Sequence, residues 1–88
     1  MYNYETEKAN LFTPSGVKQL MEVRDQVKYL IDNAGAFTGG KISVAGDSWT
    51  TLAALDYLVE EGELVKLRKD SECWGQYQVY ASPKVYNS

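Results

Sequence analysis

The chain has 88 residues, of which 44% are apolar and 24% are charged, with 7 glycines and 2 prolines. This balance fits one folded domain with a single core and excludes a disordered, collagen-like or low-complexity chain. A formal charge of −3 opposes non-specific attraction to nucleic acid. A chain without histidine and with one cysteine lacks the usual general base, the usual zinc ligands and an internal disulfide, so we expect no enzyme, no metal and no cofactor.

The N-terminal part predicts a short arm and one long helix. Residues 1–12 mix aromatic and polar side chains without a helical or strand period. Thr13 and Pro14 are typical of a helix start, because threonine accepts an unpaired backbone N–H and proline loses none at the first position. Gly35 can adopt the left-handed conformation that ends the helix. The broad apolar face of this helix is expected to contain Val17, Leu20, Met21, Val23, Val27, Leu30, Ile31 and Ala34.

The middle of the chain predicts a loop, a short strand and a second helix. Residues 35–40 contain three glycines and suit a loop, whereas residues 41–45 alternate in polarity as a short strand does. The period of residues 49–61 predicts a helix, and Gly62 follows where a left-handed cap would end it. Its buried face is expected to contain Leu52, Leu55, Leu58 and Val59.

The C-terminal part predicts a β-hairpin. Apolar and polar residues alternate at 65–68 and at 76–80, and residues 70–75 supply the turn between them. Pairs whose numbers sum to 144 place Val65 opposite Val79 and both on one face. The hairpin therefore has a register that the structure can test.

These elements make one domain with two extensions. The domain spans residues 13–82, after the arm at 1–12 and before a tail at 83–88, where Pro83 removes a donor from the strand ladder. The chain has no run of 18 apolar residues, and its acidic start differs from the basic and then apolar start of a signal peptide. We expect a cytoplasmic protein that does not bind membranes.

The order of helix, short strand, helix and hairpin resembles the winged-helix domain. The run from residue 54 to residue 65 is similar to the end of that family's recognition helix, because a Leu-x-x-Leu face precedes a glycine and an apolar strand. The resemblance covers residues 24–81 and implies a small α+β, winged-helix-like fold, with a long N-terminal helix, a second helix and a C-terminal β-hairpin wing. It also implies a regulator that binds double-stranded DNA and dimerises through the long helix. Its wing contacts would be Lys66, Arg68, Lys69 and Trp74.

Two departures from the winged-helix pattern weaken the DNA-binding interpretation. Residues 40–49 leave scarcely any room for the family's middle helix, which crosses the DNA backbone. Residues 47–63 contain five carboxylates and no Lys or Arg, a local charge of −5 that phosphates repel. For the hairpin, the alternative is that Trp74 folds back on the core and the nearby cations form a solvated face.

The second helix suggests a surface for protein binding. Small side chains around one aromatic residue permit close approach of a partner, and an acidic rim would favour a basic one. The alternative is that this stripe packs against the long helix, and the sequence leaves both open. We predict a non-enzymatic regulatory or adaptor protein, of a kind found among phage accessory proteins, or alternatively a DNA-binding regulator. The stripe lies at spacings i, i+3, i+4, i+7 and i+11 and consists of Thr50, Ala53, Ala54, Tyr57 and Glu61.

Overall fold

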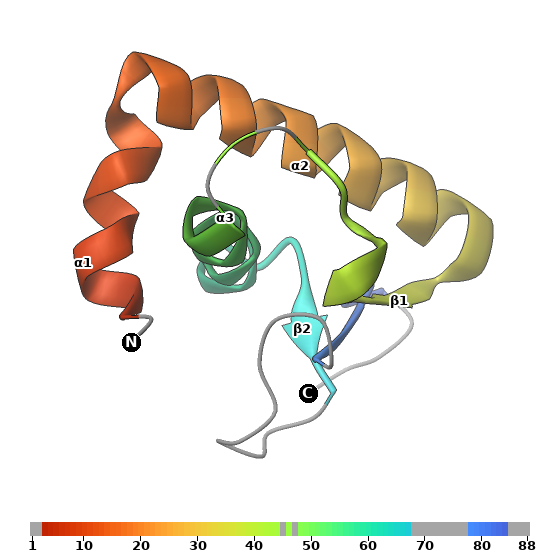
Figure 1. Ribbon diagram of the computed structural model, residues 1–88. Coiled ribbons are helices and arrows are strands. Elements are labelled where there is room, and N and C mark those ends of the chain that lie inside the picture. The colour runs from red at the N-terminus through yellow and green to blue at the C-terminus, as the bar shows by residue number, and fades with distance from the viewer. Residues whose placement is uncertain (1–2, 45, 47, 68–77, 85–88) are drawn as a thin grey trace.

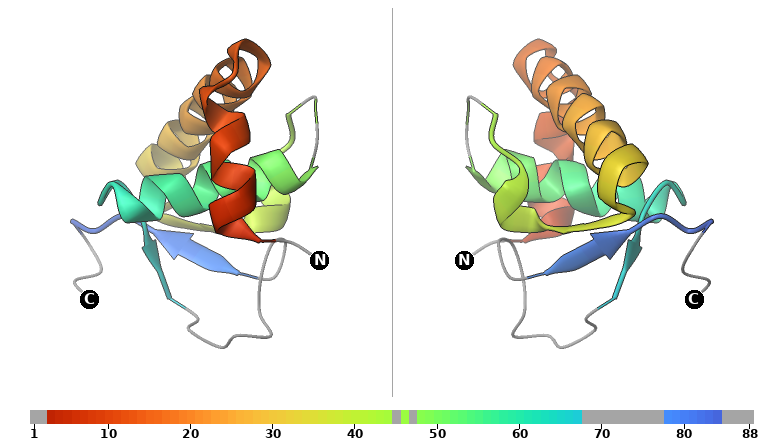
Figure 2. Two further views of the ribbon diagram at one scale, coloured as in Figure 1. Left: turned by 90° about the vertical axis from the view of Figure 1, so that its left-hand side faces the viewer. Right: turned by 90° about the vertical axis from the view of Figure 1, so that its right-hand side faces the viewer.

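The structure is a computed structural model that describes residues 3–44, 46, 48–67 and 78–84. Within these residues, three α-helices lie on one side of a three-stranded antiparallel sheet (Figures 1 and 2). The radius of gyration is 12.0 Å, close to the ~12 Å expected for a compact chain of this length. The chain therefore forms a small α+β domain.

The segment without a sequence period is helical. Helix α1 spans Tyr4–Lys8 and leads directly into a 3₁₀ turn, η1, at Ala9–Phe12. The Asn3 side chain caps α1 by accepting a hydrogen bond from the backbone of Thr6 at 3.2 Å. A helix of five residues is not stable alone, so contacts with the rest of the domain must hold it. Leu11 in η1 supplies one of them, because it is completely buried.

The ends of the long helix α2, Pro14–Ala34, are as the sequence predicts. The Thr13 hydroxyl accepts a hydrogen bond from the backbone N–H of Gly16 at 3.1 Å. Gly35 has a φ of 79° and donates its N–H to the Ile31 carbonyl at 2.9 Å, which closes the last turn. Local capping chemistry therefore determines both ends.

The first strand lies earlier than the sequence predicts. Strand β1 spans Ala36–Thr38, inside the expected loop, and a 3₁₀ turn, η2, follows at Gly39–Lys41. The expected strand at 41–45 is wrong, because residues 42–44 have no regular element. The Gln26 side chain holds both backbone groups of Ser43 there, at 2.9 and 2.6 Å, and so takes the place of a neighbouring strand.

Helix α3, Ser48–Glu60, is the central element of the fold. Gly62 ends it with a φ of 80°, as predicted, and the Glu63 N–H closes the turn on the Leu58 carbonyl at 2.9 Å. In the figures α1 lies beside α3, α2 crosses above it and the sheet lies below it (Figures 1 and 2). Of the expected buried face, Leu55 and Leu58 are buried, whereas Leu52 and Val59 are only half-buried. The covering on three sides also buries Thr50, Ala53 and Ala54.

The sheet has the order β1-β3-β2, with strand β2 at Val65–Lys66 and strand β3 at Val79–Ala81. Val65 pairs with Ala81 in place of the expected Val79, so the register differs by two residues. A shift of two keeps every side chain on its face. The predicted turn at 70–75 lies outside the described residues.

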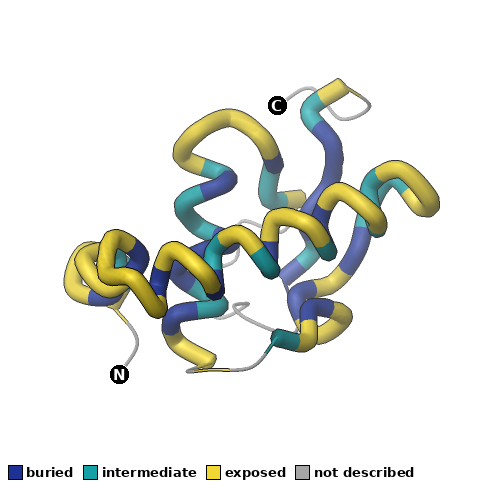
Figure 3. Tube along the Cα trace, turned by 90° about the horizontal axis from the view of Figure 1, so that it is seen from above, coloured by how far each residue is buried: buried dark blue, intermediate teal, exposed yellow. Residues whose placement is uncertain are grey.

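One hydrophobic core joins the helices to the sheet (Figure 3). Phe37 of β1 and Tyr80 of β3 are paired residues whose rings stack with centroids 5.6 Å apart. The N-terminal segment, all three helices and the sheet contribute to the core. Its buried residues are Leu11, Val23, Val27, Phe37, Ile42, Ala53, Ala54, Leu55, Leu58, Leu64 and Tyr80.

Candidate functional site

The predicted protein-binding stripe of α3 is divided between core and surface. Thr50, Ala53 and Ala54 are buried, Tyr57 is half-buried and Glu61 is exposed. The burial of these three residues favours internal packing over a binding surface at their positions. Within this stripe, the part that a partner could reach therefore begins at Tyr57.

The predicted wing contacts are described only at Lys66. Arg68, Lys69 and Trp74 lie outside the described residues. The Lys66 Nζ lies 2.7 Å from Asp56 Oδ1, and the Asp56 side chain is only 16% exposed. The charge of Lys66 is therefore compensated within the domain.

The acidic end of α3 is connected to cations from three other elements. Glu60 pairs with Lys8 of α1 at 2.7 Å, and Asp56 pairs with Lys66 of β2. Arg24 of α2 donates two hydrogen bonds to the turn after α3, from Nε to Glu63 Oε1 at 3.0 Å and from Nη2 to Glu63 Oε2 at 2.9 Å.

These pairs correct the electrostatic picture drawn from the sequence. The local charge of −5 counted only residues 47–63, whereas the paired cations come from outside that range. The four described carboxylates of the segment and their three cations together carry −1. Most of this acidic run therefore connects α1, α2 and β2 to α3, and its field is weak. The four carboxylates are Asp56, Glu60, Glu61 and Glu63.

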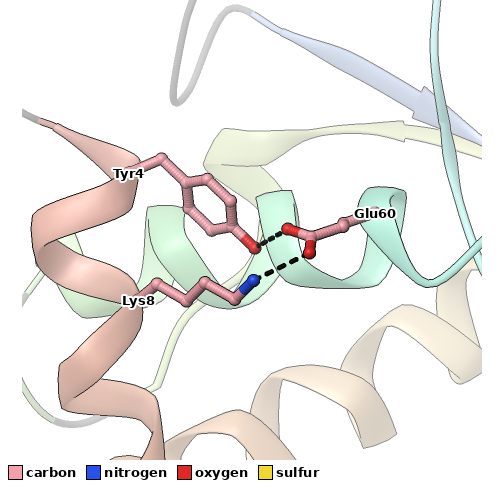
Figure 4. Close-up of polar contacts among 3 residues, drawn as sticks. All are labelled: Tyr4, Lys8 and Glu60. Atoms are coloured by element: carbon pink, nitrogen blue, oxygen red, sulfur yellow. Dashed lines mark hydrogen bonds and ion pairs between the residues drawn. The ribbon is translucent and has the colours of Figure 1, made fainter.

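The Glu60 carboxylate binds α1 through both of its oxygens (Figure 4). The Tyr4 hydroxyl donates to Oε2 at 2.5 Å, and the Lys8 ammonium donates to Oε1 at 2.7 Å. Tyr4 and Lys8 are one helical turn apart, so they present both donors on the same side of α1. The Lys8 Nζ also lies 5.7 Å from the centre of the Tyr4 ring. We call Tyr4, Lys8 and Glu60 the α1 clip.

Each member of the α1 clip has a displaced pKa. Partial burial and the hydrogen bond to Glu60 raise the pKa of the Tyr4 hydroxyl. The hydrogen bond to Glu60 also raises the pKa of Lys8. The hydrogen bonds from Lys8 and Tyr4 lower the pKa of the Glu60 carboxyl below its ordinary value of 4.5. All three displacements favour the protonation states that form the clip near neutral pH.

The α1 clip predicts that acid weakens the contribution of Glu60 to stability. A carboxyl whose pKa is lower in the folded state stabilises the fold above its unfolded pKa and loses this effect as the pH falls through its folded pKa. Glu60→Gln should therefore be less stable than wild type at pH 7, and the difference should shrink by pH 3. Urea denaturation at both pH values measures it, with Asp25→Asn, an exposed change on α2, as the control. A difference that grows in acid would contradict the lowered pKa.

Exposed apolar side chains lie on η1 and on α2, and the one on η1 contacts α3. Phe12 is 59% exposed and contacts Tyr57 edge to face, with ring centroids 5.8 Å apart. Val17 and Met21, one turn apart on α2, are 40% and 62% exposed. The expectation that both lie on the buried face of α2 is wrong, because that face is centred on Val23 and Val27. We call Phe12, Val17, Met21 and Tyr57 the apolar corner.

The apolar corner could have been suspected from the sequence. The expected apolar face of α2 is wider than a helix packed on one side can bury, so some of its members had to be exposed. Which members are exposed depends on how α3 and η1 sit against α2. The Tyr57 hydroxyl remains a polar part of the corner, and the neighbouring Glu61 carboxylate raises its pKa.

Comparison of the chain with family models, with curated proteins and with solved structures found no match. Among the residues that the structure describes, no three His, Cys, Asp or Glu side chains gather as metal ligands. None of the described helices combines the length and apolar character needed to cross a membrane.

Proposed function

We propose that this chain is a non-enzymatic regulatory or adaptor protein that binds another protein through its apolar corner. The observation that carries this proposal is the exposure of Phe12 and Met21, each more than half accessible to water. Aromatic and methionine side chains are enriched at the centres of protein interfaces, where loss of water contact supplies most of the binding free energy.

The surroundings of the apolar corner support a protein partner of mixed charge. Arg24 lies one turn after Met21 and is 60% exposed at its side chain, although it is paired with Glu63. Glu61 lies one turn after Tyr57. Because the rim carries charges of both signs, it would help to orient a bound partner but would not strongly attract a basic protein from a distance. A strongly basic partner is therefore not required.

Photo-crosslinking tests the apolar corner directly. We expect p-benzoylphenylalanine at position 12 or 21 to capture the same partner from the source cell. The matched control is the same group at position 29, because Tyr29 is also on α2 and is 67% exposed but lies away from the corner. Equal capture from position 29, or none from positions 12 and 21, would contradict the proposal.

A DNA-binding regulator remains the second candidate because of the element order. The order α2, β1, α3, β2, β3 with one antiparallel sheet is what the winged-helix resemblance predicts, and it supports this candidate. Titration with duplex DNA at low and moderate salt tests it, since binding through phosphates weakens steeply with salt. Arg68→Ala with Lys69→Ala should then weaken binding to all sequences. Analytical sedimentation would show whether the chain forms the dimer that the resemblance implies. Absence of DNA binding at low salt would exclude this candidate.

A further inference from the structure

Helix α1 is attached to the domain mainly by polar contacts. Among its five residues only Tyr4 packs against the hydrophobic core as an apolar group. The buried Glu7 carboxylate accepts a hydrogen bond from the Asn10 side chain at 2.9 Å, which is a contact inside the N-terminal segment itself. The contacts of α1 with α3 that involve its charged groups are those of the α1 clip.

The turn that follows α1 is anchored much more firmly. Leu11 is fully buried, and the backbone of Asn10 and Leu11 lies so close to Gly16 that no side chain fits between them. Local opening costs least where few apolar contacts are lost. Opening of α1 alone, with Leu11 of η1 still buried, therefore costs less than opening of both.

Helix α1 covers one side of α3. Tyr4 lies near both Asp56 and Glu60, which raise its pKa through their charges, and Lys8 lies near Tyr57 and Glu60. These three α3 residues share one side of the helix, and Ala53 lies on the same side one turn earlier. Tyr57 borders this covered side and also belongs to the apolar corner, so the two surfaces are continuous.

We propose that α1 is a hinged cover, and that the side of α3 beneath it accepts a partner helix carrying an aromatic residue and a basic residue four positions apart. Helix α1 is itself such a helix, seated there with Tyr4 and Lys8 on the two oxygens of Glu60. When α1 moves away, Glu60 loses its ion pair with Lys8, so a cation of the partner must take the place of Lys8. This inference rests on the proposed protein-binding function and adds its regulation.

Hydrogen exchange of the full chain tests the hinge. In wild type we expect the Glu7 amide, which bonds the Asn3 carbonyl at 2.9 Å, to exchange at least tenfold faster than the Val23 and Val27 amides in the buried turns of α2. Tyr4→Phe with Lys8→Gln should accelerate Glu7 about another tenfold and leave the two α2 amides unchanged. Equal rates at all three amides, or equal acceleration of all three, would show that α1 opens only with the whole domain.

A peptide in trans tests the exchangeable site. The probe is a labelled, capped peptide of residues 3–9, and fluorescence anisotropy measures its binding to the full chain. It should bind the Tyr4→Phe, Lys8→Gln variant at least tenfold more tightly than wild type, because the weakened α1 competes less. The control peptide carries the same two changes and should not bind. Equal affinity for both proteins, or binding to neither, would overturn the cover, whereas crosslinking from position 12 would still support the apolar corner.

Discussion

Leu11→Ala is expected to lower the free energy of unfolding by about 2–5 kcal/mol, because the change removes a fully buried side chain and leaves a cavity. Leu11 is among the largest completely buried side chains of the domain, although it lies in a segment that has no sequence period. Its surroundings include both α2 and α3, which contact η1. Urea denaturation at pH 7 measures the loss.

Phe12→Ala is the matched control for Leu11→Ala. The two residues are neighbours in η1, but Phe12 is mostly exposed and its packing is the edge contact with Tyr57. Removal of the Phe12 side chain should lower the free energy of unfolding by about 1 kcal/mol or less. If both changes cost the same small amount, η1 would not belong to the core and could not anchor an opening α1.

Helix ends were predictable from the sequence because they depend on neighbouring residues. Thr13 caps α2 through the N–H three residues later, and Gly35 and Gly62 end helices by their own backbone conformation. Strand β1 was not predictable in this way. Residues 41–45 have the alternation of a strand, but Phe37 is the residue that meets Tyr80, and that partner is 43 residues away.

The candidate site was predictable only at residues whose side chain suits a single kind of environment. An aromatic residue with a polar end, such as Tyr57, suits a surface bordering the core, and Tyr57 is half-buried. Alanine is ambiguous, because a small side chain suits a protein interface and close helix packing equally well. Ala53 and Ala54 are completely buried, and neither residue carries a signal that would have decided this from the sequence.

The charge of α3 was misjudged because its compensating cations are distant in sequence. Lys8 and Glu60 are 52 residues apart, and Arg24 and Glu63 are 39 apart. Exposed ion pairs of this kind add little net stability. Their effect is to fix where α1 and α2 sit on α3, so removal of one partner should mainly increase local opening, with only a small loss of global stability such as that expected for Glu60→Gln.

Gly16→Ala is expected to destabilise the domain by about 3 kcal/mol or more, against the usual trend for this substitution. Alanine normally stabilises a helix relative to glycine by roughly 0.5–1 kcal/mol. At Gly16 an added Cβ would lie 1.6 Å from the Asn10 carbonyl oxygen and 2.9 Å from the Leu11 Cα. Both are backbone atoms, so η1 as a whole must move away from α2 and withdraw Leu11 from the core.

Gly35→Ala provides the matched control. Its added Cβ would meet no atom within 4 Å, and only the φ of 79° opposes it, which costs roughly 1–2 kcal/mol. Gly16→Ala should therefore lose more stability than Gly35→Ala in urea denaturation. The reverse order would mean that η1 does not rest on Gly16. Gly16→Ala and Leu11→Ala disturb the same packing, so the double variant should lose less stability than the sum of the two single losses. Additive losses would mean that the contact of η1 with Gly16 and the burial of Leu11 are independent of each other.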